Sequence, residues 1–380
     1  MQSAYLDNSA TTRPCEAAVA AMDRCLREGW HNPSAVYKPS VEAFRALRDA
    51  RTRLLDAVGG AGCDAIFTSG GTESNNLAIL GAVGRMRGRQ VLAVSAVEHP
   101  SVREAFTRLA EAGHDVRVIG VDAAGQLKWD ELEAALDDGA SLVSCMQVNN
   151  ETGAVLDAAR LRDTVNGRAL IHVDGVQGFL RVPFDMKLAD LYTVSSHKLH
   201  GPKGVGALIV KKGVRLKPCH VGGGQESNLR SGTENTPGIA GMDAAIAELI
   251  AMGPEMPARL MAKKLRLVET VKAVVPEVIV NGPEPENGAP HIVNLGFPGV
   301  RGEVMLHALE GDGVYVSTGS ACSSKKLKVS GVLTAMGVNP RQAEWAVRFS
   351  LSPHTTDDEI EYAADKIGIL YDQLKRFQRR

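Results

Sequence analysis

Short apolar runs alternate with amphipathic segments between Asp64 and Lys211, and this pattern constrains the fold more than any other feature of the chain. The strand-like runs are residues 65–69, 90–95, 115–121, 141–148, 169–174, 190–196 and 205–210. Helical stretches separate the earlier runs, at residues 72–86, 101–113, 129–139 and 158–167. Continuous apolar strands that alternate with helices indicate a mainly parallel sheet with helices on both faces. The sequence therefore predicts an α/β fold.

The pattern changes after about residue 250. A long helix is expected at residues 256–274, then a strand–helix–strand unit and a C-terminal helix. Thr356 and Glu359 have the spacing of a capping box at the start of that last helix. A length of 380 residues suits two domains. We expect a large domain at residues 13–253, and a small α+β domain formed by residues 1–12 and 254–380.

Composition excludes several classes of function. A net charge of −1 favours neither nucleic acid nor an anionic membrane as a partner. No signal peptide is evident, and no apolar run approaches the roughly 18 residues that span a bilayer. The six cysteines include no CxxC pair, so neither a disulfide framework nor a zinc site is expected. The expected compartment is the cytosol, and no metal is expected.

Polar residues follow several of the predicted strands, at the sheet edge where such folds bind ligands. Gly70, Gly71 and Thr72 stand where a strand turns into a helix, and bare backbone amides at a helix N-terminus attract anions. A glycine turn with a threonine cap explains these residues equally well. Neither GxxxxGK[ST] nor GxGxxG occurs, so a nucleotide site is not indicated.

Three further strand ends hold His99, Asn150 and Asp174. A helix start and an ordinary loop explain the first two without any chemistry. Asp174 is more informative, because a carboxylate that ends an apolar strand needs a positive partner or a strong donor. Lys198 follows the next strand. A lysine amine, an aspartate and a helix-end phosphate site are the three anchors that pyridoxal phosphate (PLP) requires.

The same stretches resemble a known family. YLDNSATT, FTSGGTESNNLAI, VEHPSV, VNNETG, HVDGVQ, SSHKLHGPKG, GGGQESNLRSGTENTPGIAG, STGSACSS and VRFSL are similar to segments of cysteine desulfurases of the NifS/IscS type. Those enzymes belong to the class V aminotransferase family of fold-type I PLP enzymes. The matches run in order from Tyr5 to about Leu351. The resemblance implies transfer of sulfur from L-cysteine to an enzyme cysteine, with L-alanine as the other product.

The resemblance also assigns roles around the cofactor. Lys198 matches the lysine that forms a Schiff base with PLP, and Asp174 matches the partner of the pyridine nitrogen. Gln177 matches the donor to the ring's phenolic oxygen. His99 matches the histidine that stacks on the ring and is proposed as an acid/base. The positions that match phosphate ligands are Gly71, Thr72, Ser195 and His197.

The remaining roles concern the substrate, the nucleophile and a second subunit. Asn150 matches an asparagine near the ring oxygen and the substrate carboxylate, and Arg348 matches the arginine that binds that carboxylate. Thr233 matches a phosphate ligand supplied by the neighbouring subunit, which implies a homodimer. Cys322 matches the persulfide-forming nucleophile. Nearby lysines at 325, 326 and 328 would favour its thiolate.

Other functional interpretations of the sequence remain open. Selenocysteine lyase could use the same residues. A class V aminotransferase would have no need of a cysteine in the STGSACSS segment. A non-catalytic scaffold would be expected to have lost Lys198, Asp174 or Cys322. The sequence does not name the sulfur acceptor, which could be an iron–sulfur scaffold or a tRNA-thiolation protein.

Overall fold

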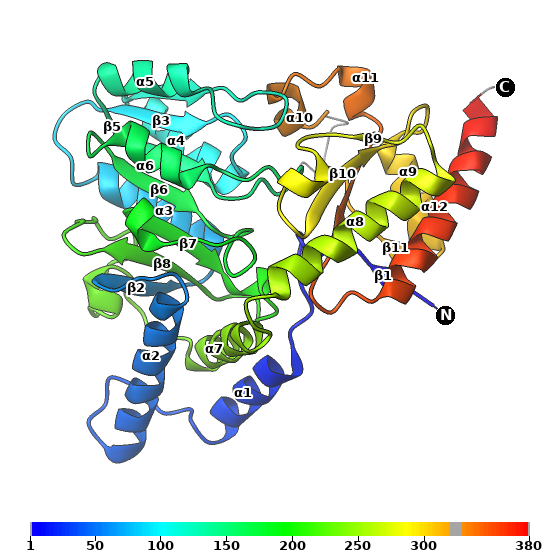
Figure 1. The fold of residues 1–380 in the computed structure, drawn as a ribbon. Helices are drawn as coiled ribbons and strands as arrows, with labels where there is room; N and C mark the ends of the chain where they lie inside the picture. The colour runs from blue at the N-terminus through cyan, green and yellow to red at the C-terminus, as the bar shows by residue number, and fades with distance from the viewer. Residues whose placement is uncertain (1, 320–328, 379–380) are drawn as a thin grey trace.

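The structure, a computed structural model, describes residues 2–319 and 329–378. Its largest element is a seven-stranded sheet of order β2-β8-β7-β6-β5-β3-β4 (Figure 1). The strands are β2 (Cys63–Thr68), β3 (Val91–Ser95), β4 (Asp115–Ile119), β5 (Ala140–Met146), β6 (Leu170–Asp174), β7 (Leu191–Ser195) and β8 (Gly206–Lys211). Only β8 runs antiparallel to its neighbours, β7 and β2. Every predicted strand run forms a strand, and the mainly parallel α/β sheet is confirmed.

The sheet is buried on both faces, as its continuous apolar strands require. Along β2, Ala65 and Phe67 pack into one hydrophobic cluster and Ile66 into another, because successive side chains point to opposite faces. Helices α3 (Gly71–Val83) and α4 (Pro100–Glu111) cover the Ile66 face. The opposite face is covered by α2 (Lys38–Asp56), α5 (Trp129–Asp137), α6 (Ala158–Val165) and α7 (Thr236–Ala251).

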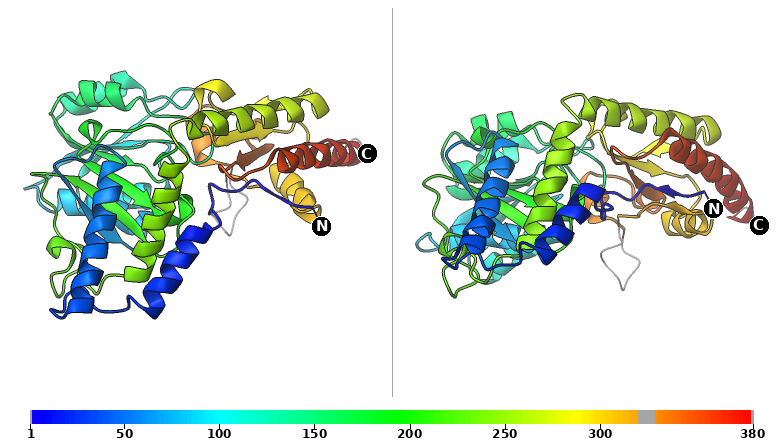
Figure 2. Two further views of the ribbon diagram at one scale, coloured as in Figure 1. Left: turned by 60° about the horizontal axis from the view of Figure 1, so that its bottom comes forward. Right: turned by 90° about the horizontal axis from the view of Figure 1, so that it is seen from below.

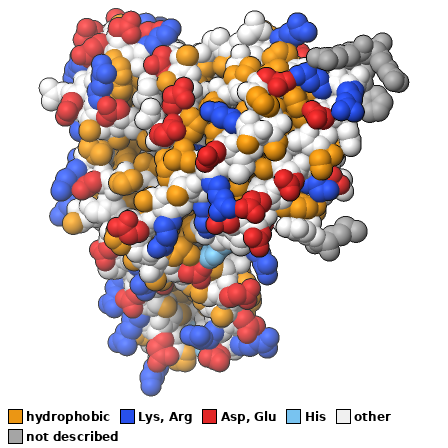
Figure 3. Space-filling model, turned by 45° about the vertical axis from the view of Figure 1, so that its right-hand side comes forward, with side chains coloured by type: hydrophobic (Ala, Val, Ile, Leu, Met, Phe, Trp, Pro, Cys, Tyr) orange, Lys and Arg blue, Asp and Glu red, His pale blue; other side chains and the backbone are white. Residues whose placement is uncertain are grey.

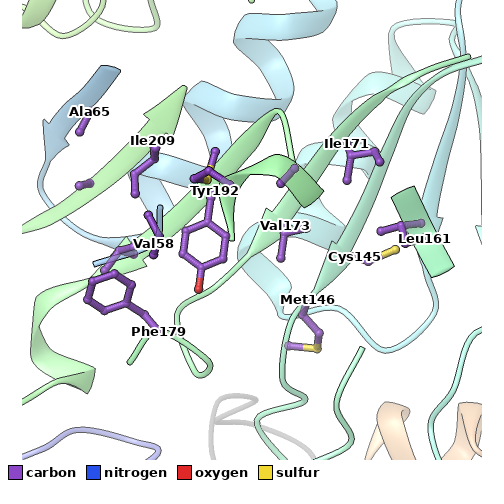
Figure 4. Packing of buried hydrophobic residues seen from close by; sticks show 14 of the residues in the cluster. Val58, Ala65, Cys145, Met146, Leu161, Ile171, Val173, Phe179, Tyr192 and Ile209 are labelled. Atoms are coloured by element: carbon purple, nitrogen blue, oxygen red, sulfur yellow. The ribbon is translucent and has the colours of Figure 1, made fainter. Parts of the chain in front are cut away.

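One buried tyrosine illustrates the packing on the second face. Figure 4 shows Tyr192 among Val58, Phe179 and Ile209. Its hydroxyl donates to Gln147 Oε1 at 2.6 Å, so the polar tip of this fully buried ring is satisfied. A Cβ at Gly175 would lie 2.0 Å from the Tyr192 ring, so the strand end beside Asp174 requires glycine at this position.

A second group of elements lies beside the large sheet (Figures 1 and 2). Its three-stranded sheet has the order β12-β10-β9. The elements are α8 (Met256–Val274), β9 (Ile279–Val280), β10 (Ile292–Gly296), α9 (Gly302–Gly311), β11 (Val314–Tyr315), α10 (Gly331–Ala335), α11 (Pro340–Ala343), β12 (Ala346–Ser350) and α12 (Asp357–Gln378). Short 3-10 helices occur in the loops of both groups of elements: η1 (Met186–Leu188), η2 (Ser196–Lys198) and η3 (Glu226–Asn228) beside the large sheet, and η4 (Pro285–Asn287) in the second group. The predicted capping box is confirmed: Thr356 and Glu359 each accept a hydrogen bond from the other's backbone amide.

The N-terminal segment joins this second group. Strand β1 (Ala4–Tyr5) pairs in parallel with β11, and Leu6 is buried in the same hydrophobic cluster as α8 and α12. Helix α1 (Glu16–Arg27) then packs against α7 beside the large sheet. The predicted division into residues 13–253 and the remainder stays a prediction, and the two separate cores favour it. Over the described ranges, no helix is long and apolar enough to cross a membrane.

Candidate active site

A cavity of about 300 Å³ opens at the carboxyl ends of β5, β6 and β7. Among the predicted site residues that the structure describes, those that line it are Gly71, Thr72, His99, Asn150, Asp174, Gln177, Ser195, His197, Lys198 and Arg348. The exception is Thr233, which is exposed and does not line the cavity. Cys322 lies outside the described residues. The chain that leads toward it, Ser317 to Gly319, does line the cavity.

Lys198 ends η2, the short helix that follows strand β7. Its Nζ donates to the carbonyl oxygen of Ser9 at 2.6 Å and to that of Ala10 at 2.7 Å. Both carbonyls belong to the segment that links β1 to α1. A partly buried ammonium needs such acceptors, and these two place the amine at the cavity wall.

Asp174, the last residue of β6, is almost completely buried. Its Oδ1 accepts from the Val176 amide at 3.0 Å, and its Oδ2 accepts from Asn75 Nδ2 at 2.8 Å. Burial raises the pKa of this carboxyl above its usual value, although the two hydrogen bonds and the nearby His99 and Lys198 oppose the shift. A cation at the cavity side of Asp174 would therefore stabilise its ionised form.

The N-terminus of α3 also lines the cavity, through Gly71 and Thr72. Gly70 has φ +149°, a conformation that favours glycine, and it directs the chain into the first turn of the helix. A Cβ at Gly71 would lie 2.9 Å from Val176 Cγ2, so this close approach of backbone also requires glycine. Thr72 follows in the first turn. Free amides at a helix N-terminus suit a phosphate group.

His197 lies beside this anion site as a neutral donor. Burial, followed by the charges of Lys198 and Lys203, lowers the pKa of His197 to about 4. Its Nδ1 lies 3.1 Å from Thr11 Oγ1. At neutral pH, His197 can therefore offer a hydrogen bond to an anion without adding a positive charge.

His99 is the N-cap of α4, and its ring reaches the cavity. Its Nδ1 accepts from the Ser101 backbone amide at 3.2 Å and lies 2.8 Å from Ser101 Oγ. Burial lowers the pKa of this imidazole, an effect that Asp174 opposes and that Lys198 and Arg103 reinforce. A backbone amide can only donate, so Nδ1 accepts and the neutral ring carries its proton on Nε2.

Arg348 approaches the cavity from the second group of elements, in the middle of β12. Its guanidinium donates to Asn150 O at 3.0 Å and to Asp7 Oδ1 at 2.6 Å. The side chain is only 7% exposed. Arg348 Nε has no partner among the described residues. This buried guanidinium lines the cavity while it binds the Asp7 carboxylate, which holds it in place for a second, bound carboxylate.

The sequence interpretation missed three residues of this site. Asn75 and Ser101 connect Asp174 to His99, and Asp7 holds Arg348. All three stand within the motifs quoted above, but no role was assigned to them. Asn75 carried a detectable signal, because it lies one helical turn before Ile79, on the apolar face of α3. A fully buried asparagine at such a position needs polar partners.

The family of the chain follows from comparison with known proteins. The model of the aminotransferase class-V family matches residues 4–363, and the chain belongs to this family. A cysteine desulfurase of Sinorhizobium fredii is 40% identical over 381 residues, which cover 99% of this chain and 98% of that relative. A cysteine desulfurase of Trichormus azollae is 37% identical over 98% of this chain and 93% of its own length.

Solved structures are similar as well. A structure described as a NifS-like protein is 33% identical, with a TM-score of 0.90 over 98% of this chain and all of that one. SspA in complex with cysteine is 28% identical, with a TM-score of 0.80 over 93% of this chain and all of that one. These comparisons confirm the predicted family and fold.

Proposed function

We propose that this chain is a PLP-dependent cysteine desulfurase, which converts L-cysteine to L-alanine and holds the sulfur as a persulfide on Cys322. One observation carries the proposal. A single cavity brings together the Lys198 amine, the Asp174 carboxylate, the anion site at the start of α3 and the guanidinium of Arg348. Relatives at 37–40% identity named cysteine desulfurase, and the likeness to SspA in complex with cysteine, support this choice of reaction.

The cavity fits PLP on its own chemistry. Asp174, whose pKa burial raises, calls for a cationic partner such as a protonated pyridine nitrogen. Gln177 lines the cavity, and its Nε2, the donor that a ring oxygen would need, donates to Ser9 O at 2.9 Å. Lys198 would hold the cofactor's aldehyde, Gln177 its ring oxygen, and the end formed by Gly71, Thr72, Ser195 and His197 its phosphate. When bound, PLP supplies an electron sink for bonds at the substrate's α carbon.

The protein's own groups bind the substrate and move its protons. Arg348 pairs with the substrate carboxylate, and Asn150, whose carbonyl holds Arg348, orients the same end. Lys198 Nζ moves the proton at the substrate's α carbon. His99 lines the cavity, and the hydrogen on its Nε2 can donate a hydrogen bond to a bound group. Each role uses a group that lines the cavity.

Cys322 completes the proposal as the nucleophile. Its thiolate would attack the sulfur of bound cysteine, so that a sulfur–sulfur bond forms as the carbon–sulfur bond breaks and a persulfide is left on the enzyme; PLP would supply the acceptor for the carbon–sulfur electron pair. This step explains how sulfur can leave carbon as a transferable group. The position of Ser317 to Gly319 on the cavity wall supports it, because residue 322 is three positions further along the chain.

A homodimer is part of the proposal. Thr233 is exposed, and Arg230 in the same loop binds Glu73 in the first turn of α3 at 2.9 Å. Helices α1 and α2 extend from the rest of the chain on either side of α7 (Figure 1), and both pack against α7. They and their linker expose Leu26, Trp30, Val36, Tyr37 and Phe44. Exposed apolar surface of this kind marks an interface, and a second copy would bring Thr233 to the partner's phosphate site.

The sulfur acceptor is proposed to be a protein of an iron–sulfur or tRNA-thiolation system in the cytoplasm. The described cysteines are all free, as expected in a reducing compartment. On the face shown in Figure 3, acidic and basic side chains are interspersed. Such a mixed surface does not favour a nucleic-acid partner.

One experiment tests the reaction. Purified protein with PLP is incubated with L-cysteine and a thiol reductant, and alanine and sulfide are measured together. We expect equal amounts of both, and the Lys198→Ala variant is the control. Alanine without sulfide, or no turnover, would overturn the proposal. Activity with selenocysteine and none with cysteine would make the chain a selenocysteine lyase, and amino-group transfer to a keto acid would make it an aminotransferase.

A further inference from the structure

A continuous chain of hydrogen bonds runs along the cavity wall from Asp174 to His99. Asn75 Nδ2 donates to Asp174 Oδ2 at 2.8 Å and to Ser101 Oγ at 2.9 Å. Ser101 Oγ lies 2.8 Å from His99 Nδ1, and the Ser101 amide donates to the same nitrogen at 3.2 Å. Two helices and a strand end meet here, because Asn75 lies on α3, Ser101 on α4 and Asp174 at the end of β6.

The direction of every proton in this chain is determined. Asp174 as a carboxylate can only accept, so Asn75 must present its NH₂ group to it. Both hydrogens of that group are then used, one on Asp174 and one on Ser101 Oγ. Since Ser101 Oγ accepts from Asn75, it is free to donate its own hydrogen to His99 Nδ1. His99 Nδ1 thus accepts two bonds, and its proton lies on Nε2.

We propose that Asn75 and Ser101 are positioning residues that couple the orientation of the Asp174 carboxylate to the hydrogen bonds that hold the neutral ring of His99. Neither would touch the substrate. Asn75 is fully buried and holds one oxygen of Asp174, which leaves the carboxylate one fixed direction toward the cavity. Ser101 holds the His99 ring and keeps Nε2–H directed away from α4. The inference rests on the proposed PLP-dependent reaction, in which Asp174 and His99 face the cofactor.

The coupling has a defined sense. If Asp174 were protonated, it would need an acceptor, and the Asn75 amide could then turn its oxygen toward it. The bond from Asn75 to Ser101 would be lost, and the Ser101 hydroxyl could turn its hydrogen toward the Asn75 oxygen, so His99 Nδ1 would keep only the Ser101 amide as a donor. Ionised Asp174 therefore goes with a neutral His99 ring whose Nδ1 accepts from two donors. Charged groups that face His99 are Asp174 from β6, Lys198 from η2 and Arg103 from its own helix.

The variants Asn75→Ala, Ser101→Ala and Ser101→Thr test this coupling. Thr107→Ala is the matched control, since it removes an exposed hydroxyl from the same helix, whose hydrogen bond in the described part of the chain is to Arg103 O. The readout is the nitrogen NMR spectrum of holoenzyme with labelled histidine, in which His99→Gln identifies the His99 signals. We expect Nε2 to carry the proton in the wild type, in Ser101→Thr and in Thr107→Ala.

Removal of either positioning residue should change this spectrum. In Ser101→Ala, His99 loses one of two donors to Nδ1, so its titration should move to higher pH, and kcat/KM should fall about fivefold, the value of one neutral hydrogen bond. Asn75→Ala should shift the pH titration of the bound cofactor's absorbance as well, because Asp174 loses a donor. The double variant Asn75→Ala/Ser101→Ala should cost less than the sum of the two single changes, since both interrupt one chain.

Each of these measurements either supports or overturns the proposed coupling between Asp174 and His99. A proton on His99 Nδ1 in the wild type, a measurement that needs no variant of the network, would overturn the coupling. So would additive effects in the double variant, or Ser101→Thr behaving like Ser101→Ala. If the wild-type protein released no sulfide from cysteine, the proposed function would be overturned instead. The tautomer of His99 could still be measured on the same protein.

Discussion

Arg348→Lys is the sharpest test of how the site binds its substrate. In the structure, the guanidinium of Arg348 donates to Asn150 O and Asp7 Oδ1 and keeps Nε unused. A lysine ammonium retains the positive charge, but it replaces the planar guanidinium, which can donate two parallel hydrogen bonds, with a compact charged group. The variant can stay paired with Asp7, and it then loses at least one charge-assisted hydrogen bond to the substrate carboxylate.

The expected magnitude follows from that one bond. A hydrogen bond to a charged group contributes about 1.5–3 kcal/mol, so KM for L-cysteine should rise about 10- to 150-fold. The value of kcat should change much less, because the carboxylate keeps its charge and contacts throughout the reaction. Sulfide and alanine release, measured over a range of cysteine concentrations, separates the two constants.

A second substrate makes the assay specific for the carboxylate. Cysteamine lacks that group, so the preference of the enzyme for L-cysteine over cysteamine should fall in Arg348→Lys by the same factor. Arg301→Lys is the control, because Arg301 is exposed and its ion pair with Glu303 lies outside the cavity. An unchanged preference for L-cysteine in Arg348→Lys would refute the reasoning and remove Arg348 from the substrate site.

Three further predictions concern the cofactor, the nucleophile and pH. Borohydride should fix PLP to Lys198 of the yellow holoenzyme, and peptide mass spectrometry that finds it on another lysine would reassign the cofactor site. Cys322→Ser should keep the cofactor and still bind cysteine but lose sulfide release at least a hundredfold; turnover of cysteine at the wild-type rate would exclude the persulfide route. Burial lowers the pKa of His172 to about 3, so the unfolded chain binds more protons than the folded one between about pH 6.5 and 3. The neutral His172 imidazole therefore contributes its full stabilisation above about pH 6.5. As pH falls from about 6.5 to 3, the free energy of unfolding decreases by about 1.4 kcal/mol per pH unit. Denaturant titrations at several pH values should show a weaker dependence in His172→Gln than in the wild type, and equal slopes would contradict the assignment.

The large sheet was the most predictable part of the fold. Its strands are apolar throughout because both faces are covered, and the helical segments between them mark where each strand begins and ends. The reversed direction of β8 was not predicted. The connection between β7 and β8, residues 196–205, is nevertheless too short for the crossover helix that a parallel neighbour needs, so this reversal was detectable in the sequence.

Many of the predicted site residues are polar side chains at or just after the ends of apolar strands. Asp174 and Lys198 could be found in this way, whereas Arg348, in the middle of β12, and Thr233, in a loop, were assigned only by the resemblance. Asn75 could not be assigned a role, since its partners lie 26 and 99 positions away along the chain. The same holds for Asp7, whose partner Arg348 is 341 positions away. Such pairs are set by tertiary packing, which no local pattern reports.

The pairing of β1 with β11 has a consequence for the order in which the protein is made. The strand that contains Ala4 has no partner until Val314, roughly 310 residues later, has been synthesised. At about 5–20 residues per second, a ribosome needs roughly 15 to 60 seconds to synthesise that interval. Until then the N-terminal segment is bonded only to residues beside the large sheet, such as Gln177, His197 and Lys198, while its Asp7 has no Arg348 to hold. The large sheet can form during translation, but the catalytic cavity is assembled only when synthesis is nearly complete.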